Sequence, residues 1–179
     1  MDEDIERVLI DEAVIGRRLD RLAEKVVAEI PEDPLVVIVI LKGAMVFVAD
    51  LLRRIPRQLE IECITVSSYH GGTESSGRVD FLDHVFPKVE GRSVLVLDDI
   101  LDTGRTLFEV SKRLREHGAR KVRCGVLLAK DKARAAEARA DYVGFEIGDE
   151  FVVGYGLDYR GRYRNLPFVG VLKDEVVEA

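Results

Sequence analysis

The sequence predicts an α/β protein in which a mostly parallel, twisted sheet is flanked by helices. Two apolar runs carry this prediction, at residues 35–41 and 94–97, because unbroken apolar runs are typical of strands buried on both faces of a parallel sheet, and residues 122–129 add another strand. The two runs are each followed by a segment with helical spacing, as the strand–helix alternation of such folds requires. A chain of 179 residues can bury a sizeable core, so we expect one domain spanning residues 1–179.

Composition and charge narrow the functional class. Hydrophobic residues make up 47% of the chain and charged residues 34%, as in globular proteins. A net charge of −6 gives no general attraction to nucleic acid or to anionic membranes, so neither partner is expected. The chain opens with acidic residues and no basic, apolar leader, and its longest apolar run is too short to span a bilayer, so we expect a cytoplasmic protein. Cys63 and Cys124 stand alone in apolar segments and are expected to be buried free thiols.

The first part of the chain supplies a helix, a strand and a second helix. Apolar residues at three- and four-residue steps predict an amphipathic helix over 15–30, which Pro31 and Pro34 end. The strand at 35–41 delivers Lys42 and Gly43 at its carboxyl end, before a helix at about 44–54. Ligands of open α/β sheets gather at the carboxyl ends of strands, so these two residues are expected near the functional site.

The next segments are a strand, a loop and a connector. Apolar and polar residues alternate over 59–67, which predicts a strand with at least one covered face. Residues 67–77 are polar and rich in glycine, a composition typical of a loop tip or of a functional lid. Residues 81–90 are expected to form a connector or a short edge hairpin.

The most informative stretch is 93–107, which changes from a strand to an acidic edge and then to a loop. The strand at 94–97 is followed by Asp98 and Asp99, and the loop 102–106 contains Gly104. A helix is expected to begin near Thr106, with Glu109 completing a capping box, and to end at Gly118. A small loop at a helix N-terminus favours an anion, whereas two carboxylates favour hydroxyl groups or a divalent cation.

The remaining segments extend the sheet. The strand at 122–129 ends in Lys130, and a further strand is expected at 141–147. Residues 132–139 are charged and rich in alanine, which predicts a solvated turn or short helix without a site. The stretch 143–159 is expected to hold two short strands, with Phe151 and Asp158 near a bend.

The stretch 93–107 resembles the phosphoribosyl pyrophosphate (PRPP) motif of type I phosphoribosyltransferases, in which hydrophobic residues precede two acids, two hydrophobic residues and Asp-Thr/Ser-Gly-x-Thr. The segment from Phe151 to Arg164 is similar to the hypoxanthine-guanine members, and the resemblance runs from about Leu35 to Leu172. It implies the type I fold with a small hood formed by the C-terminal segment, and an enzyme of purine salvage. It also implies PRPP, hypoxanthine and guanine as substrates, Mg²⁺ as cofactor, and a homodimer or homotetramer.

The resemblance also implies a role for individual residues. Asp98 and Asp99 would bind the ribose hydroxyls, and Asp102 would lie near N7 of the base as the catalytic residue. The other roles are the 5-phosphate cradle (Asp102, Thr103, Gly104, Arg105, Thr106, Leu107), pyrophosphate binding (Lys42, Gly43, Arg164), purine binding (Lys130, Phe151, Val152, Asp158), Mg²⁺ binding (Asp158, Asp98, Asp99) and the lid (Ser68, Tyr69).

Several alternatives stay open at this point. A carboxylate of ordinary pKa is a weak base at neutral pH, so Asp102 either acts as general base with a changed pKa or mainly positions N7. Arg160 and Arg162 compete with Arg164 for pyrophosphate. Lys130 selects a 6-oxo group without reading position 2, which leaves a xanthine-preferring enzyme as an alternative. A non-catalytic RNA-binding regulator shares the central motif, but the net charge argues against it.

Overall fold

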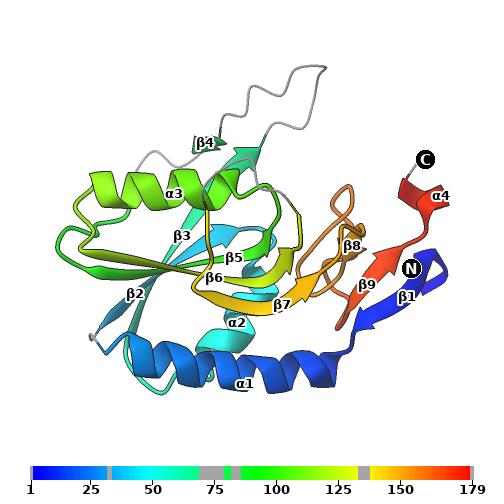
Figure 1. The fold of residues 1–179 in the computed structure, drawn as a ribbon, viewed down its shortest axis with the longest axis horizontal. Coiled ribbons are helices and arrows are strands. Elements are labelled where there is room, and N and C mark those ends of the chain that lie inside the picture. Colours follow the sequence, from blue (N-terminus) through cyan, green and yellow to red (C-terminus); the bar gives the residue numbers. More distant parts are fainter. Residues whose placement is uncertain (1, 32–33, 69–78, 82–85, 133–137, 178–179) are drawn as a thin grey trace.

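The computed structural model describes residues 2–31, 34–68, 79–81, 86–132 and 138–177. Within these residues a six-stranded sheet has the order β4-β3-β2-β5-β6-β7, and a smaller sheet has the order β1-β9-β8 (Figure 1). The strands are β1 (Ile5–Ile10), β2 (Leu35–Leu41), β3 (Leu59–Ser68), β4 (Val79–Phe81), β5 (Ser93–Leu101), β6 (Lys121–Lys130), β7 (Tyr142–Ile147), β8 (Val152–Val153) and β9 (Val169–Leu172).

The large sheet is parallel from β3 to β7, and only its edge strand β4 runs antiparallel, against β3. Helices α1 (Glu12–Glu29) and α2 (Met45–Leu52) cover one face, and α3 (Arg105–Glu116) covers the other (Figure 1). A 3-10 helix at Asp2–Asp4 precedes β1, and the short helix α4 (Asp174–Val177) follows β9. The predicted α/β class with a mostly parallel sheet is therefore confirmed.

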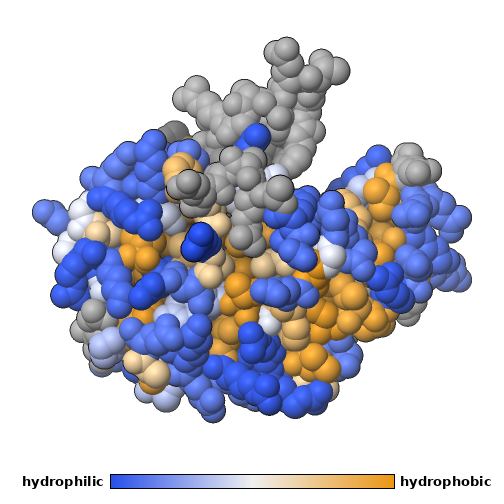
Figure 2. Space-filling model, viewed as in Figure 1, coloured by the Kyte–Doolittle hydropathy of each residue, from blue (hydrophilic) through white to orange (hydrophobic). Residues whose placement is uncertain are grey.

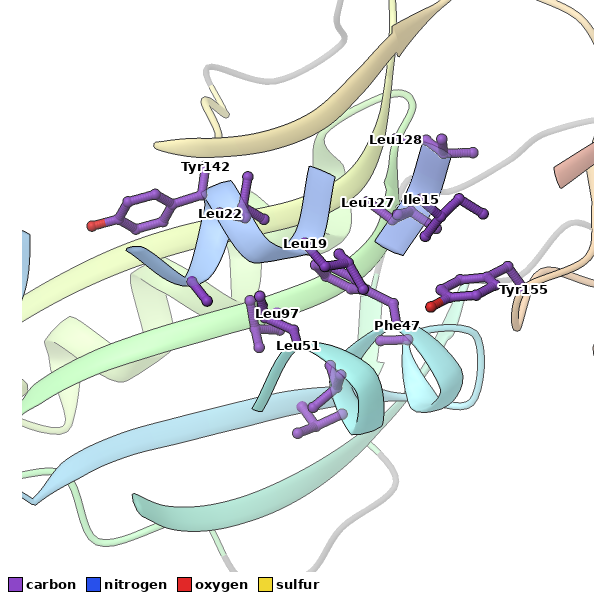
Figure 3. Close-up of a cluster of buried hydrophobic side chains, with 14 of the residues drawn as sticks. Ile15, Leu19, Leu22, Phe47, Leu51, Leu97, Leu127, Leu128, Tyr142 and Tyr155 are labelled. Atoms are coloured by element: carbon purple, nitrogen blue, oxygen red, sulfur yellow. The ribbon is translucent and has the colours of Figure 1, made fainter. Parts of the chain in front are cut away.

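Each face of the sheet has its own core, as the alternation of side chains along buried strands requires. Figure 3 shows Ile15, Leu19 and Leu22 of α1 packed toward Phe47 and Leu51 of α2 and toward the sheet. On the opposite face, Leu107, Val110 and Leu114 of α3 pack over β5 and β6 and share a core with alternate residues of these strands. Both cores fix the helices, and therefore the loops at the carboxyl ends of the strands.

The small sheet is the hood that the resemblance implied, but the N-terminus contributes to it as well. Strand β1 pairs antiparallel with β9, which in turn pairs antiparallel with β8. The two ends of the described chain therefore meet in one sheet beside the carboxyl ends of the large sheet (Figure 1). Strands β1 and β9 were not predicted from the sequence.

Several local predictions need correction. Strand β5 continues to Leu101, past the two acidic residues at which it was expected to stop. Helix α3 begins at Arg105 with Gly104 as its N-cap and no side-chain cap hydrogen bond, so the capping box from Thr106 to Glu109 is wrong. Gly118 does adopt the expected positive φ, 83°, just after the helix.

The two thiols differ in their surroundings. Cys124 is buried as predicted, whereas Cys63 is exposed, which contradicts the expectation for that residue. Cys63 lies on β3 one strand outside β2, and its neighbour on the same face, Ile61, is 52% exposed. The outer part of β3 is therefore not covered by the helices on that face, and Ile64 is the only buried side chain among those described for this strand.

The surface mixes charged and apolar regions. In Figure 2 hydrophilic residues cover most of this view, and a band of apolar residues is exposed near its centre and toward the hood. Among the helices of the described residues, none combines the length and hydrophobicity needed to cross a membrane.

Candidate active site

The predicted site residues gather near the topological switch point of the large sheet, between β2 and β5. From β2 the chain proceeds to β3 on one side, whereas β5, β6 and β7 follow on the other side of β2. Strands β2 and β5 are parallel neighbours, so their carboxyl ends lie side by side at this switch point. A crevice at such a point is where open α/β sheets bind ligands.

The carboxyl end of β5 carries two carboxylates inside the sheet edge. Asp98 is only 7% exposed, and its Oδ1 accepts a hydrogen bond of 3.0 Å from the Asp99 amide. Oδ1 of Asp99 accepts a bond of 2.8 Å from the Ile100 amide. Burial, followed by the neighbouring charge of Asp99, raises the pKa of Asp98 well above its ordinary value, and burial also raises the pKa of Asp99. Such a pair favours a cation or hydroxyl donors as its ligand.

The loop after β5 exposes the N-terminus of α3. Gly104 has a φ of 81°, a left-handed conformation that lets the backbone turn sharply into the helix. The first helical hydrogen bond runs from the Phe108 amide to the Gly104 carbonyl, at 3.0 Å. The amides of residues 105–107 precede that bond, and helix geometry leaves them without a partner in the helix. This arrangement suits an anion such as phosphate.

Lys42 and Gly43 lie between the acidic pair and the hood. A Cβ atom added to Gly43 would lie 1.6 Å from Oδ2 of Asp99, so the carboxylate rests directly on the glycine backbone. On the other side, a Cβ atom added to Gly156 would lie 2.1 Å from the Gly43 carbonyl oxygen. The peptide bond between Leu41 and Lys42 is cis. The structure thus brings the loop after β2, the acids of β5 and the hood together.

Asp158 and Arg164 form an ion pair in the hood. Nη2 of Arg164 lies 2.6 Å from Oδ1 of Asp158, and Nη1 donates to the Gly156 carbonyl at 2.6 Å. The positive charge of Arg164 opposes the rise in the pKa of Asp99, which places Arg164 near the acidic pair. Arg160 instead lies over the Tyr159 ring, 5.0 Å from its centroid, and Arg162 is exposed. Among the three arginines, this geometry favours Arg164 for an anion beside Asp99.

The hood also presents an aromatic ring to solvent. Phe151 is 42% exposed, and its ring meets Tyr159 edge to face at a centroid distance of 5.3 Å. The following residue, Val152, is buried in β8. An exposed aromatic ring held by a second ring is a suitable platform for a planar base.

Lys130 ends β6 on the same side of the sheet, and the structure adds two residues that the sequence did not single out. Nζ of Lys130 lies 3.0 Å from Oδ1 of Asp149, which follows β7. Nζ of Lys132 lies 2.9 Å from the same oxygen and 2.5 Å from Oδ1 of Asp102. Lys132 was expected to belong to a solvated segment without a site, and its contact with Asp102 places it beside a predicted site residue. The sequence did contain a signal for this cluster. Lys130 and Lys132 follow one predicted strand, and Asp149 follows the next, so opposite charges could have been expected at the same edge of the sheet.

The predicted lid and the predicted metal site are the two features that the described residues leave as predictions. Ser68 is the last residue of β3, and Tyr69 lies outside the described residues, so the lid stays a prediction. No group of three or more His, Cys, Asp or Glu residues that could hold a metal ion occurs in the described ranges. Magnesium commonly uses one or two protein carboxylates and completes its shell with substrate phosphates and water, so the acidic pair has the right oxygen ligands for it.

Comparison with known proteins gives a consistent result. The model of the phosphoribosyl transferase domain matches residues 10–160. The chain is 44% identical over 179 residues to the hypoxanthine-guanine phosphoribosyltransferase of Bacillus subtilis, covering 100% of this chain and 99% of that protein. It is 47% identical over 176 residues to the same-named protein of Lactococcus lactis, covering 98% and 96%. A crystal structure of a hypoxanthine phosphoribosyltransferase from Staphylococcus aureus has a TM-score of 0.92 at 43% identity, covering 98% of this chain and 96% of that one.

Proposed function

This chain belongs to the phosphoribosyl transferase domain family, and we propose that it transfers the 5-phosphoribosyl group of PRPP to N9 of hypoxanthine or guanine. The products are IMP or GMP and pyrophosphate, so the enzyme serves purine salvage. The type I phosphoribosyltransferase fold predicted from the sequence is confirmed. The observation that carries the proposal is that the PRPP-motif residues and the purine-side residues meet at one edge of the sheet, in a chain with full-length relatives of that name.

The proposed reaction breaks one bond and forms another at the same carbon. N9 of the base attacks the anomeric carbon of PRPP as the bond to the pyrophosphate oxygen breaks, and the bonding electrons leave with pyrophosphate. The proton on N7 must leave as the new bond forms: it moves to Asp102 or, where Asp102 only positions N7, to water. The ribosyl carbon gains positive character in the transition state, so the carboxylates Asp98 and Asp99, near the ribose hydroxyls, favour that state over the ground state.

The anionic parts of PRPP each have a proposed partner. The 5-phosphate lies in the loop 102–106 and accepts hydrogen bonds from the backbone amides at the start of α3, which the left-handed Gly104 leaves accessible. Pyrophosphate lies against Lys42, the Gly43 backbone and Arg164. Arg164 already pairs with Asp158, so it is held in one orientation before the substrate enters.

The purine has a stacking partner and two polar partners. Its face packs on Phe151, its edge meets the Val152 backbone, and Lys130 donates to O6. A 6-amino group cannot accept that bond, which excludes adenine. Position 2 has no charged partner among these residues, so hypoxanthine and guanine are both expected, and xanthine remains the alternative base.

Magnesium is proposed as the cofactor on the chemistry of its oxygen ligands. Asp98, Asp99 and Asp158 are the side chains that would hold it with PRPP, and all three are carboxylates within or beside the crevice. When bound, Mg²⁺ offsets negative charge on the leaving pyrophosphate. One oxygen of Asp158 accepts from the Gly161 amide at 2.7 Å and the other pairs with Arg164, so lone pairs on both oxygens remain for a cation.

The test is nucleotide formation from PRPP and Mg²⁺ with hypoxanthine, guanine, xanthine, adenine and uracil supplied separately. We expect turnover of hypoxanthine and guanine, and a strong reduction in Asp102→Asn. Asp131→Asn is the matched control, because this exposed acid is close in sequence to Lys130 and has no proposed role. Retained PRPP binding without turnover of any base would overturn the enzyme and favour the RNA-binding regulator, whereas turnover of xanthine alone would change the substrate.

We also propose that the protein is a cytoplasmic homodimer or homotetramer of one-domain subunits. An exposed free thiol, Cys63, is best maintained in a reducing compartment. Met45 of α2 and Ile61 of β3 are 53% and 52% exposed on the same side of the sheet, and a second subunit would cover them. Light scattering of the purified protein measures the assembly directly.

A further inference from the structure

Four charged residues form a continuous line along the purine side of the crevice. Oδ1 of Asp149 accepts from both Lys130 and Lys132, at 3.0 and 2.9 Å, and Lys132 reaches on to Oδ1 of Asp102 at 2.5 Å. The residues come from the carboxyl ends of β5, β6 and β7, which are consecutive neighbours in the sheet. The outer members of this line, Lys130 and Asp102, are the two groups assigned above to O6 and N7 of the purine.

The contacts leave each outer group able to bind a substrate atom. Oδ1 of Asp102 is a buried atom without a hydrogen bond of regular geometry, and its close neighbour is the ammonium group of Lys132 in an ion pair, so the second carboxylate oxygen is the one left for N7–H. Lys130 has three N–H donors and uses one on Asp149, which leaves others for O6. The side chain of Lys130 is only 11% exposed, so its ammonium group depends on a nearby acid for compensation.

An ordinary surface ion pair is the competing interpretation. The side chains of Lys132, Asp102 and Asp149 are 30%, 40% and 64% exposed, and ion pairs of that exposure contribute little to stability. The placement of Lys132 and Asp149 argues for another role, because these two residues connect Asp102 and Lys130, which must contact neighbouring atoms of one purine. Fixing such groups before binding lowers the entropic cost of orienting the base.

We propose that Lys132 and Asp149 are positioning residues that hold Asp102 and Lys130 at the spacing of N7 and O6 of a 6-oxopurine. This inference rests on the proposed function. Lys132 fixes the orientation of the Asp102 carboxylate, and Asp149 anchors Lys132 and Lys130 together. Neither Lys132 nor Asp149 is among the residues assigned above to the 5-phosphate or to pyrophosphate, so we expect their effect on the base and not on PRPP.

The experiment compares Lys132→Ala, Lys132→Arg and Asp149→Asn with wild type in steady-state assays of hypoxanthine, guanine and PRPP. Lys112→Ala on the exposed side of α3 and Asp131→Asn are the matched controls. We expect kcat/KM for hypoxanthine to fall about tenfold in Lys132→Ala and about fivefold in Asp149→Asn, with KM for PRPP within twofold of wild type. Guanine should be affected equally, because hypoxanthine and guanine share the N7–O6 edge.

Lys132→Arg should restore most of the activity, since a guanidinium group can donate to both acids. Base-specific losses with normal unfolding temperatures would support the positioning role. The positioning role would be overturned if the substitutions changed the kinetic constants for PRPP as much as those for the base. It would also be overturned if Lys132→Ala and Asp149→Asn behaved like the controls. In both cases an active wild type would leave the proposed function standing. A wild type that forms no nucleotide from any 6-oxopurine would overturn both.

Discussion

Gly43→Ala is the substitution whose effect follows most directly from the structure. The added methyl group would lie 1.6 Å from Oδ2 and 2.5 Å from Cγ of Asp99, whereas ordinary contact begins at about 3.4 Å. The carboxylate must therefore turn away, and it loses the bond of 2.8 Å from the Ile100 amide. A displaced Asp99 carboxylate would also lose its proposed hydrogen bond to a ribose hydroxyl. Hydrogen bonds to charged groups contribute about 1.5–3 kcal/mol, which corresponds to a roughly ten- to hundredfold rise in KM for PRPP.

Steady-state kinetics and thermal unfolding measure this effect. Gly16→Ala is the matched control, because its added Cβ would meet only Arg54 Nη2, at 3.7 Å, and Gly16 lies inside α1. Helix propensity predicts that this control is about 0.5–1 kcal/mol more stable and equally active. If Gly43→Ala kept KM for PRPP within twofold and unfolded at the wild-type temperature, the contact between Asp99 and this backbone would be refuted.

Three further predictions concern the base, the thiols and the acids. Phe151→Leu should raise KM for hypoxanthine about tenfold without changing KM for PRPP, since stacking on a base contributes about 1–3 kcal/mol; equal KM values would contradict this. A thiol reagent at neutral pH should label Cys63 but not Cys124 in the folded protein, because burial raises the pKa of Cys124 to about 11; its labelling should increase with pH toward that value, and two equally fast thiols would contradict this. Asp98→Asn should abolish activity yet raise the unfolding temperature at neutral pH. Burial raises the pKa of Asp98, so ionisation favours the unfolded chain; the gain should vanish below about pH 3.8, where both states are protonated, and a lower unfolding temperature at neutral pH would contradict this.

Much of the large sheet was predictable because its signals are local. Strand β2 has the predicted bounds, since residues 35–41 are apolar throughout and prolines stand before the run. The PRPP motif is equally local, because one strand, one loop and one helix hold its residues. Its position at the carboxyl ends of the strands followed from the general rule for parallel sheets, whereas the switch point became visible only with the strand order.

The hood and the charged line depend on contacts that no local pattern records. Strand β1 pairs with β9, more than 150 residues away along the chain. Its sequence, Ile-Glu-Arg-Val-Leu-Ile, places two charged residues side by side and therefore lacks the alternation of apolar and polar residues that predicts a strand. The bridge from Lys132 to Asp102 and Asp149 arises because β5, β6 and β7 are neighbours, which places three distant acids and bases at one edge. Without that strand order, Lys132 belongs to an unremarkable charged segment.

The length of β5 links stability to function at this site. The strand continues through Leu101, and Asp98 stands opposite Val126 of β6, so the sheet itself excludes water from the carboxylate. Burial makes the ionised acid costly for the folded chain, and a substrate that donates hydroxyl groups or carries a cation removes that cost. PRPP with Mg²⁺ should therefore bind the wild type more tightly than Asp98→Asn and, at the same ligand concentration, stabilise it more, because only the wild type has the buried charge to compensate.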